Sequence, residues 1–254
     1  MDKTLFFICL INLSFPLFGQ VDTINITSET TNHRFNKFSV KDYILPSVLI
    51  GYGLIAIEND YLKLINVEIR NELQENIDRR LTVDDYAQFV PALSVYSLNL
   101  FGIKSKNDIE KRSIILGTST LVMVGTVRTL KSLTKVERPD KSSKNSFPSG
   151  HTATAFAGAE FLWHEYRDVS HWYGITGYAI AIGTGFFRIY NARHWLSDVA
   201  MGAGIGILST KCAYLIQPYI SRKLFDKRSH IQVMLSPTLQ NNILGMGLNL
   251  GITF

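Results

Sequence analysis

Residues 148–162 read PSGHTATAFAGAEFL, a polar tetrapeptide followed directly by an apolar, alanine-rich run. Ser149 is a good N-cap, because its side-chain oxygen can accept a hydrogen bond from the first turn of a helix. Gly150 lets the backbone approach a ligand closely. The stretch therefore predicts a helix start whose backbone amides form a phosphate cradle, with His151 beside it. For the tetrapeptide alone, an ordinary capped helix with an incidental histidine is the alternative.

Apolar segments surround this stretch on both sides. Helices are favoured over strands, because the segments are long, rich in alanine and separated by charged turns. Small residues recur within them, as in Gly202 and Gly206, and permit close helix contact. We therefore predict an all-α bundle of about six apolar helices. Their approximate ranges are 43–57, 86–103, 113–133, 151–166, 172–190 and 195–220.

The two ends of the chain differ from this bundle. An apolar run behind Lys3 ends near the small residue Gly19, which predicts a signal peptide over residues 1–19. Residues 20–105 are expected to hold a polar leader and the N-terminal helices. These include an amphipathic surface helix at Ile65–Leu81, where apolar residues recur at helical spacing. Residues 223–254 contain a basic turn and two alternating segments, which predict a short β-hairpin-like tail.

Composition limits the class of partner. The net charge of +5 suits an anionic substrate or an anionic membrane surface. No nucleic acid is expected, because the basic residues form no continuous run with interleaved aromatics. The mean hydropathy of +0.09 is low for a protein buried mostly in lipid, although the apolar segments leave a membrane possible. No Cys/His cluster has zinc-ligand spacing, so no metal is expected.

His194 and Asp198 form a second polar group, at the start of the last apolar segment. They are four residues apart, so on one helix they share a face. A carboxylate there can accept a hydrogen bond from Nδ1 of the imidazole and leave Nε2 free and nucleophilic. Simple helix stabilisation is the alternative for such a pair. Arg188 lies six residues before His194, at the end of the preceding segment.

Lys131 and Arg138 form the third group, seven residues apart. An arginine can engage two phosphate oxygens at once, and a lysine supplies a point charge. Taken alone, the pair is equally consistent with a basic helix end that complements the helix dipole or meets lipid headgroups.

In combination, the three groups resemble the type 2 phosphatidic acid phosphatase (PAP2) family. Its superfamily includes the bacterial class A acid phosphatases and the vanadium haloperoxidases. The resemblance covers roughly residues 110–215 and suggests a catalytic core at 106–222. One departure is Phe187, since the family usually has serine directly before the third-motif arginine. The motifs are Lys131-x6-Arg138-Pro139, Pro148-Ser149-Gly150-His151 and Arg188-x5-His194-x3-Asp198.

The resemblance implies a role for each site residue. His194 is then the nucleophile that takes the phosphoryl group, Asp198 its orienting partner, and His151 the general acid for the departing alcohol. Water hydrolyses the phosphohistidine, with no metal and no cofactor. Spread positive charge is what a phosphoryl-transfer transition state requires. The groups that would bind the phosphoryl oxygens are Lys131, Arg138, Ser149, Gly150 and Arg188.

Three further side chains carry looser expectations. Arg193 is either an extra phosphate contact or an exposed surface arginine. Trp195 adjoins His194 and is a candidate for an interfacial anchor or a substrate contact. His164, at a helix edge, is expected to be solvated.

The expected function is hydrolysis of a phosphomonoester or pyrophosphate of a lipid, of phosphatidate, isoprenyl pyrophosphate or lipid A type. A periplasmic acid phosphatase for soluble substrates is the main alternative. A vanadium-dependent haloperoxidase and a membrane scaffold that binds phosphorylated lipid without turnover are weaker ones. In a serpentine bundle the motifs share one face. If that face is outside the cell membrane, the basic turns at 104–112 and 222–228 lie on the cytoplasmic side, where positive charge is usually in excess. We therefore expect a membrane-associated protein with an extracytoplasmic, periplasmic active site.

Overall fold

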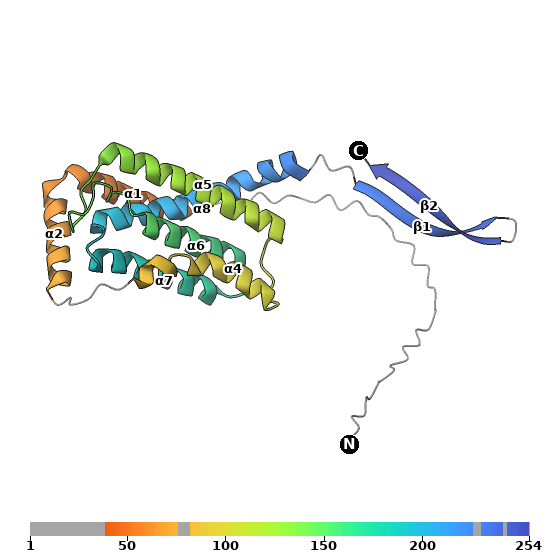
Figure 1. Ribbon diagram of the computed structural model, residues 1–254, viewed down its shortest axis with the longest axis horizontal. Coiled ribbons are helices and arrows are strands. Elements are labelled where there is room, and N and C mark those ends of the chain that lie inside the picture. The colour runs from red at the N-terminus through yellow and green to blue at the C-terminus, as the bar shows by residue number, and fades with distance from the viewer. Residues whose placement is uncertain (1–38, 76–81, 226–229, 241–242, 254) are drawn as a thin grey trace, which may run out of the picture. The chain divides into compact units, whose positions relative to one another are not determined.

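A computed structural model describes residues 39–75, 82–225, 230–240 and 243–253 (Figure 1). The expected signal peptide and most of the leader lie outside these residues. Within them the chain forms a helical bundle, which confirms the predicted all-α class. The helices are α1 (Lys41–Glu58), α2 (Asp60–Gln74), α3 (Val83–Ala87), α4 (Val90–Leu100), α5 (Ile109–Thr134), α6 (Gly150–Tyr166), α7 (His171–Tyr190) and α8 (Leu196–Phe225).

Two N-terminal segments differ in detail from the prediction. The apolar stretch 86–103 is divided between α3 and α4. The division falls where Pro91 occupies the first turn of α4, a position that tolerates its missing N–H. The amphipathic helix α2 begins at Asp60, earlier than expected, because the Asn59 side chain accepts a hydrogen bond from the Leu62 amide at 3.1 Å. Helix α2 ends at Gln74.

Helix α6 is the centre of the bundle. It packs against α4, α5, α7 and α8 (Figure 1). Its alanines and Gly158 are buried, and their small side chains let the neighbouring helices come close. Two glycines of α8 complete this contact. A Cβ at Gly202 would lie 2.4 Å from the Ser149 carbonyl oxygen, and one at Gly206 would lie 2.3 Å from that of Ala153.

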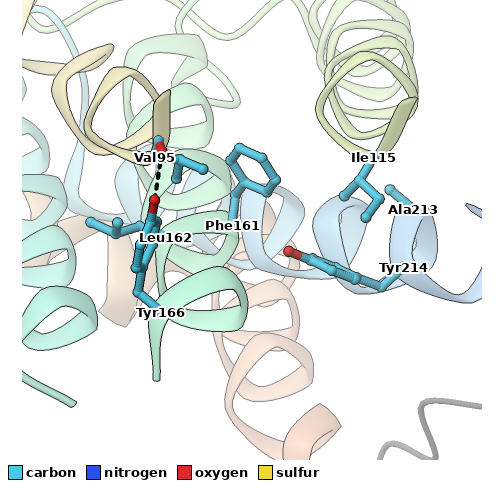
Figure 2. Close-up of a cluster of buried hydrophobic side chains, with 7 residues drawn as sticks. All are labelled: Val95, Ile115, Phe161, Leu162, Tyr166, Ala213 and Tyr214. Carbon is cyan, nitrogen blue, oxygen red and sulfur yellow. Dashed lines mark hydrogen bonds between the residues drawn. The ribbon is translucent and has the colours of Figure 1, made fainter. Parts of the chain in front are cut away.

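An aromatic and aliphatic core fills the end of the bundle away from the start of α6. Figure 2 shows this cluster, in which the Tyr166 hydroxyl donates to the Val95 carbonyl at 2.9 Å. The hydrogen bond allows a tyrosine to be fully buried. The cluster therefore ties α4 to the C-terminal part of α6. Its members are Val95, Ile115, Phe161, Leu162, Tyr166, Ala213 and Tyr214.

The expectation that His164 is solvated is wrong. Its side chain is 3% exposed, and its Nε2 lies 2.9 Å from Glu160 Oε1. Lys211 of α8 donates to the same carboxylate oxygen at 2.6 Å. Buried charges of this kind need partners, and here α6 supplies the carboxylate while α8 supplies the ammonium. Hydropathy along α6 alone does not reveal this pairing.

Two helices in the described part of the chain are long and apolar enough to cross a membrane, and they differ in burial. In α5 only 22% of the most apolar window is buried, whereas in α8 the share is 72%. Helix α8 is thus largely a core helix, while α5 presents apolar side chains such as Leu121 and Leu133 on the surface.

The predicted tail is a two-stranded antiparallel hairpin. It consists of β1 (His230–Gln240) and β2 (Ile243–Thr253). The register pairs His230 with Thr253 and Gln240 with Ile243. The alternating pattern of this segment therefore predicted the correct local structure.

Substitution of Gly206 by alanine tests the close approach of α6 and α8. We expect Gly206→Ala to lower the free energy of unfolding by about 1–3 kcal/mol, because the new methyl group meets a backbone carbonyl that cannot move aside. Gly183→Ala in α7 is the control, since nothing lies within 4 Å of its Cβ position. There, better helix propensity should stabilise the protein by about 0.5–1 kcal/mol. Thermal unfolding of both variants makes the comparison, and equal stability of the two would contradict the packing argument.

Candidate active site

One cavity is lined by residues from all three motifs, although His194 and Asp198 are not among its lining residues. Its volume is about 330 Å³, and its lining includes one residue from each group: Arg138, His151 and Arg188. Arg138 follows α5 in a loop, His151 is in the first turn of α6, and Arg188 is near the end of α7. The remaining lining residues are Thr82, Asp84, Asp85, Asn191 and Arg193.

Two guanidinium groups on this cavity have a free donor. The Nε atoms of Arg138 and Arg188 are both buried and have no hydrogen-bond partner among the described residues. A buried N–H without an acceptor is costly. The Nε atoms of Arg70 and Arg112, which do not line the cavity, are in the same situation. The Arg138 backbone is held by its amide, which donates to the Ser143 carbonyl at 3.0 Å. Arg138, Arg188 and Arg193 all line the cavity, and their positive charge suits an anion.

The start of α6 is tied to the start of α8. Ser149 caps α6, as predicted: its hydroxyl oxygen accepts from the Thr152 amide at 3.4 Å. The Ser149 amide donates to the Asp198 carbonyl at 3.0 Å, so it is not available to a ligand. Gly150 is the first residue of α6, where an amide has no acceptor within the helix. Of the predicted cradle, Gly150 rather than Ser149 keeps its backbone donor.

Lys131 supports the loop that leads into α6. Its ammonium donates to the carbonyl oxygens of Asn145, at 2.5 Å, and Ser146, at 3.4 Å. It is not among the residues that line the cavity. Its positive charge still lies close enough to lower the pKa of His194.

His194 and Asp198 form a buried pair, in which His194 Nδ1 lies 3.6 Å from Asp198 Oδ2. This separation is longer than a normal hydrogen bond. The same Oδ2 accepts from the Trp195 amide at 2.9 Å and from the Ser146 hydroxyl. The His194 amide donates to the Arg188 carbonyl at 3.3 Å. The carboxylate is thus fixed on the Nδ1 side of the imidazole.

Burial controls the charge of His194. Its side chain is 2% exposed, and this desolvation lowers its pKa from 6.5 to about 4. Asp198 opposes the shift, while Lys131 and Arg188 add to it. The imidazole is therefore neutral at physiological pH, which is the form that can act as a nucleophile.

His151 is partly exposed at the cavity. Its Nε2 lies 3.0 Å from Asp85 Oδ1. Burial is the main reason that its pKa is lowered, and Arg188 adds to the shift, whereas Asp85 opposes it. Its position allows proton transfer to an oxygen that leaves through the cavity.

Sequence reasoning missed two carboxylates of α3. Asp84 Oδ2 accepts from Arg188 Nη1 at 2.6 Å, and Asp84 Oδ1 accepts from the Asn191 amide nitrogen Nδ2 at 3.1 Å. Asp85 Oδ1 lies 3.3 Å from the same Arg188 nitrogen. About a hundred residues separate these partners, so no local spacing reveals them. The one available signal was an acidic pair at the edge of an apolar segment.

Phe187 does not contribute to the cavity lining. Its ring packs 5.8 Å from that of Phe186 and 6.1 Å from that of Tyr190, measured between ring centroids. A different hydroxyl lies near His194: Ser146 Oγ is 3.5 Å from His194 Nδ1, on the side away from the proposed nucleophilic Nε2.

Arg193 and Trp195, the two further candidates near the motifs, both form hydrogen bonds within the protein. Arg193 lines the cavity, and its Nη1 donates to Asp140 at 3.3 Å. Trp195 donates its indole N–H to the Glu137 carbonyl at 2.9 Å. In the described ranges no group of three or more His, Cys, Asp or Glu side chains has the arrangement of a metal site.

Part of the chain is similar in sequence to known proteins. Residues 112–222 match the model of the PAP2 superfamily. The chain is 39% identical over 141 residues to a protein of Porphyromonas gingivalis described as lipid A 1-phosphatase. That match covers 55% of this chain and only 32% of the relative's length.

Two solved structures also resemble the chain, each at 22% identity. The crystal structure of Aquifex aeolicus LpxE matches 59% of this chain and 94% of its own, with a TM-score of 0.44. The first transmembrane PAP2 type phosphatidylglycerolphosphate phosphatase from Bacillus subtilis matches 72% of this chain and 99% of its own, with a TM-score of 0.43.

The low pKa of His194 predicts a loss of stability in acid. Below pH 6.5 the unfolded chain takes up a proton at this histidine, whereas the folded chain does not until pH 4 is approached. Stability therefore falls as the pH drops through this window, by about 2 kcal/mol between pH 7 and pH 5 from this group alone. Thermal unfolding at both pH values should show a smaller loss for His194→Gln than for the wild type. His171→Gln, on the exposed start of α7, is the control and should behave like the wild type.

Proposed function

We propose that the chain, whose residues 112–222 match the model of the PAP2 superfamily, is a member of that superfamily and a metal-independent phosphatase for a phosphorylated lipid. The cavity lined by the guanidinium groups of Arg138, Arg188 and Arg193, with His151 beside them, carries this proposal. A phosphoryl group offers several anionic oxygens to such donors. The 39% identity to a protein described as lipid A 1-phosphatase favours a lipid A type 1-phosphate among the lipid esters.

The proposed reaction proceeds in two steps. Nε2 of His194 attacks phosphorus, the N–P bond forms, and the ester P–O bond breaks as His151 gives its proton to the departing oxygen. Water then attacks the phosphohistidine, His151 accepts a proton from it, and phosphate leaves with His194 restored. Asp198, held on the Nδ1 side, stabilises the positive charge that develops on His194. Arg138 and Arg188 stabilise the charge on the phosphoryl oxygens.

The surface of the bundle supports a membrane setting. Helix α5 is long enough to span a bilayer and leaves most of its apolar window uncovered. Large apolar side chains are also exposed on α4 and α7, among them Leu100 and Ile182. Exposed apolar area on this scale is unusual for a soluble protein. A lipid substrate would be delivered from the same membrane.

Basic residues at the end of the bundle away from the cavity favour an extracytoplasmic site. The Lys106 amide donates to the Glu165 carbonyl at 3.0 Å, which places the basic α4–α5 turn at the end of α6 opposite His151. Arg222 and Lys223 lie at the end of α8 opposite Asp198. An excess of positive charge marks the cytoplasmic side of membrane proteins. We therefore place the cavity on the outer, periplasmic side.

Phosphate release by the purified full-length chain tests the function. The substrates to compare are a lipid A 1-phosphate, an isoprenyl pyrophosphate, a phosphatidate and the soluble ester p-nitrophenyl phosphate. We expect a preference for the lipid A ester and a loss of about 10³-fold or more in His194→Ala, because the nucleophile is removed. His171→Ala is the matched control and should keep full activity. Activity confined to the soluble ester would assign the chain to the acid phosphatases, and an active His194→Ala protein would refute the mechanism.

The pH dependence of kcat/KM should be bell-shaped and shifted to the acid side. Activity falls below about pH 4, where His194 becomes protonated and loses its lone pair. It also falls as the pH rises through the pKa of His151, because the general acid is then deprotonated. That pKa is lowered from 6.5, so the alkaline limb should lie below this value. Asp168→Asn, on the exposed turn before α7, is a control that should leave both limbs in place. An optimum in the alkaline range would contradict these assignments.

A further inference from the structure

Helix α3 brings two neighbouring carboxylates to the cavity, and they differ in accessibility. The side chain of Asp84 is 1% exposed, whereas that of Asp85 is 49% exposed. Both contact Arg188, which is itself buried. The two residues therefore share a partner but differ in how freely they can leave it.

Asp84 is a fixed counter-ion. Its two carboxylate oxygens are engaged separately, one by Arg188 at 2.6 Å and one by Asn191 at 3.1 Å. A buried arginine needs such a partner, and two hydrogen bonds from neighbouring donors leave the carboxylate no alternative position. Asp84 thus positions the guanidinium of Arg188 at the cavity.

Asp85 differs from Asp84 because one of its oxygens contacts both His151 and Arg188. Its Oδ1 lies 3.0 Å from His151 Nε2 and 3.3 Å from Arg188 Nη1. One carboxylate oxygen is thus shared by the proposed general acid and a proposed phosphate-binding group. A phosphoryl group that binds at Arg188 with its leaving oxygen at His151 would lie against this carboxylate. Two anions cannot occupy this position together, because at such separations like charges repel strongly.

We propose that Asp85 is a further active-site residue, an internal anion that holds His151 and Arg188 in position and yields both to phosphate. The inference rests on the proposed function, because it takes the cavity to be a phosphate site. Half of the Asp85 side chain faces solvent, so its carboxylate can move outward and be hydrated, whereas that of Asp84 cannot.

The consequence is a lower affinity of the site for inorganic phosphate. A ligand that binds only the form of the site from which Asp85 has withdrawn has its affinity reduced by the fraction of that form. A phosphorylated lipid offsets this reduction with contacts along its apolar part, whereas the product phosphate has none. Asp85 would therefore promote release of inorganic phosphate and reduce inhibition by phosphate in the surroundings.

The test is the affinity for inorganic phosphate of the detergent-purified full-length protein, measured by titration calorimetry. Asp85→Asn keeps the shape and removes the charge, and we expect its Kd for phosphate to be about tenfold lower than that of the wild type. Asp84→Asn is the matched variant on the adjacent residue. It should bind phosphate more weakly, because Arg188 loses its fixed partner. Asp85→Ala is a second removal of the competing anion and should also tighten binding.

A purely structural role for Asp85 predicts the opposite sign. If Asp85 only orders the cavity, both of its variants bind phosphate more weakly, as Asp84→Asn does. An unchanged or weaker affinity in Asp85→Asn and Asp85→Ala overturns the inference. So does the absence of phosphate binding in all four proteins.

Ester hydrolysis by the same preparations separates this inference from the proposed function. Tighter phosphate binding in the Asp85 variants of a protein that hydrolyses no ester would refute the proposed function and leave the competition intact. Hydrolysis without any tightening would do the reverse.

Discussion

The site depends on how closely the starts of α6 and α8 approach each other. Two glycines of α8, Gly202 and Gly206, leave no side chain between the helix backbones. This contact allows the Ser149 amide to donate to the Asp198 carbonyl at 3.0 Å. As a result, the helix that carries His151 and the helix that carries Asp198 begin side by side. Any residue larger than glycine at these two positions would push them apart.

Around this contact, charged groups are paired at two places: beside the buried His194 and at the cavity. Asp198 faces the buried imidazole of His194, and its Oδ2 is held by Ser146 and by the Trp195 amide. Toward the cavity, Arg188 is held by Asp84. Asp198 and Asp84 therefore each have hydrogen-bond donors around them. The Nε atoms of Arg138 and Arg188 have no acceptor among the described residues. A polar site inside an apolar bundle is stable only with such pairing.

Sequence patterns predicted those features of the molecule that depend on interactions between residues close together in the chain. The N-cap at Ser149, the run of α6 and the alternation in the C-terminal hairpin each follow from residues within a few positions of one another. Contacts between distant residues were not predictable in this way. Glu160 lies one helical turn before His164, but the burial of this pair and its contact with Lys211 follow only from the packing of α6 on α8.

The sequence by itself determined the helical class and the order of the three motifs, and it singled out three motif residues that line the cavity, Arg138, His151 and Arg188. Periodicity and motif spacing are properties of the chain, so they can be read before folding is known. Tertiary structure alone decided what each group touches. It turned Lys131 toward loop carbonyls and brought α3 against Arg188 and His151. Those contacts join segments far apart in the chain, and only packing decides which side chains such segments place together.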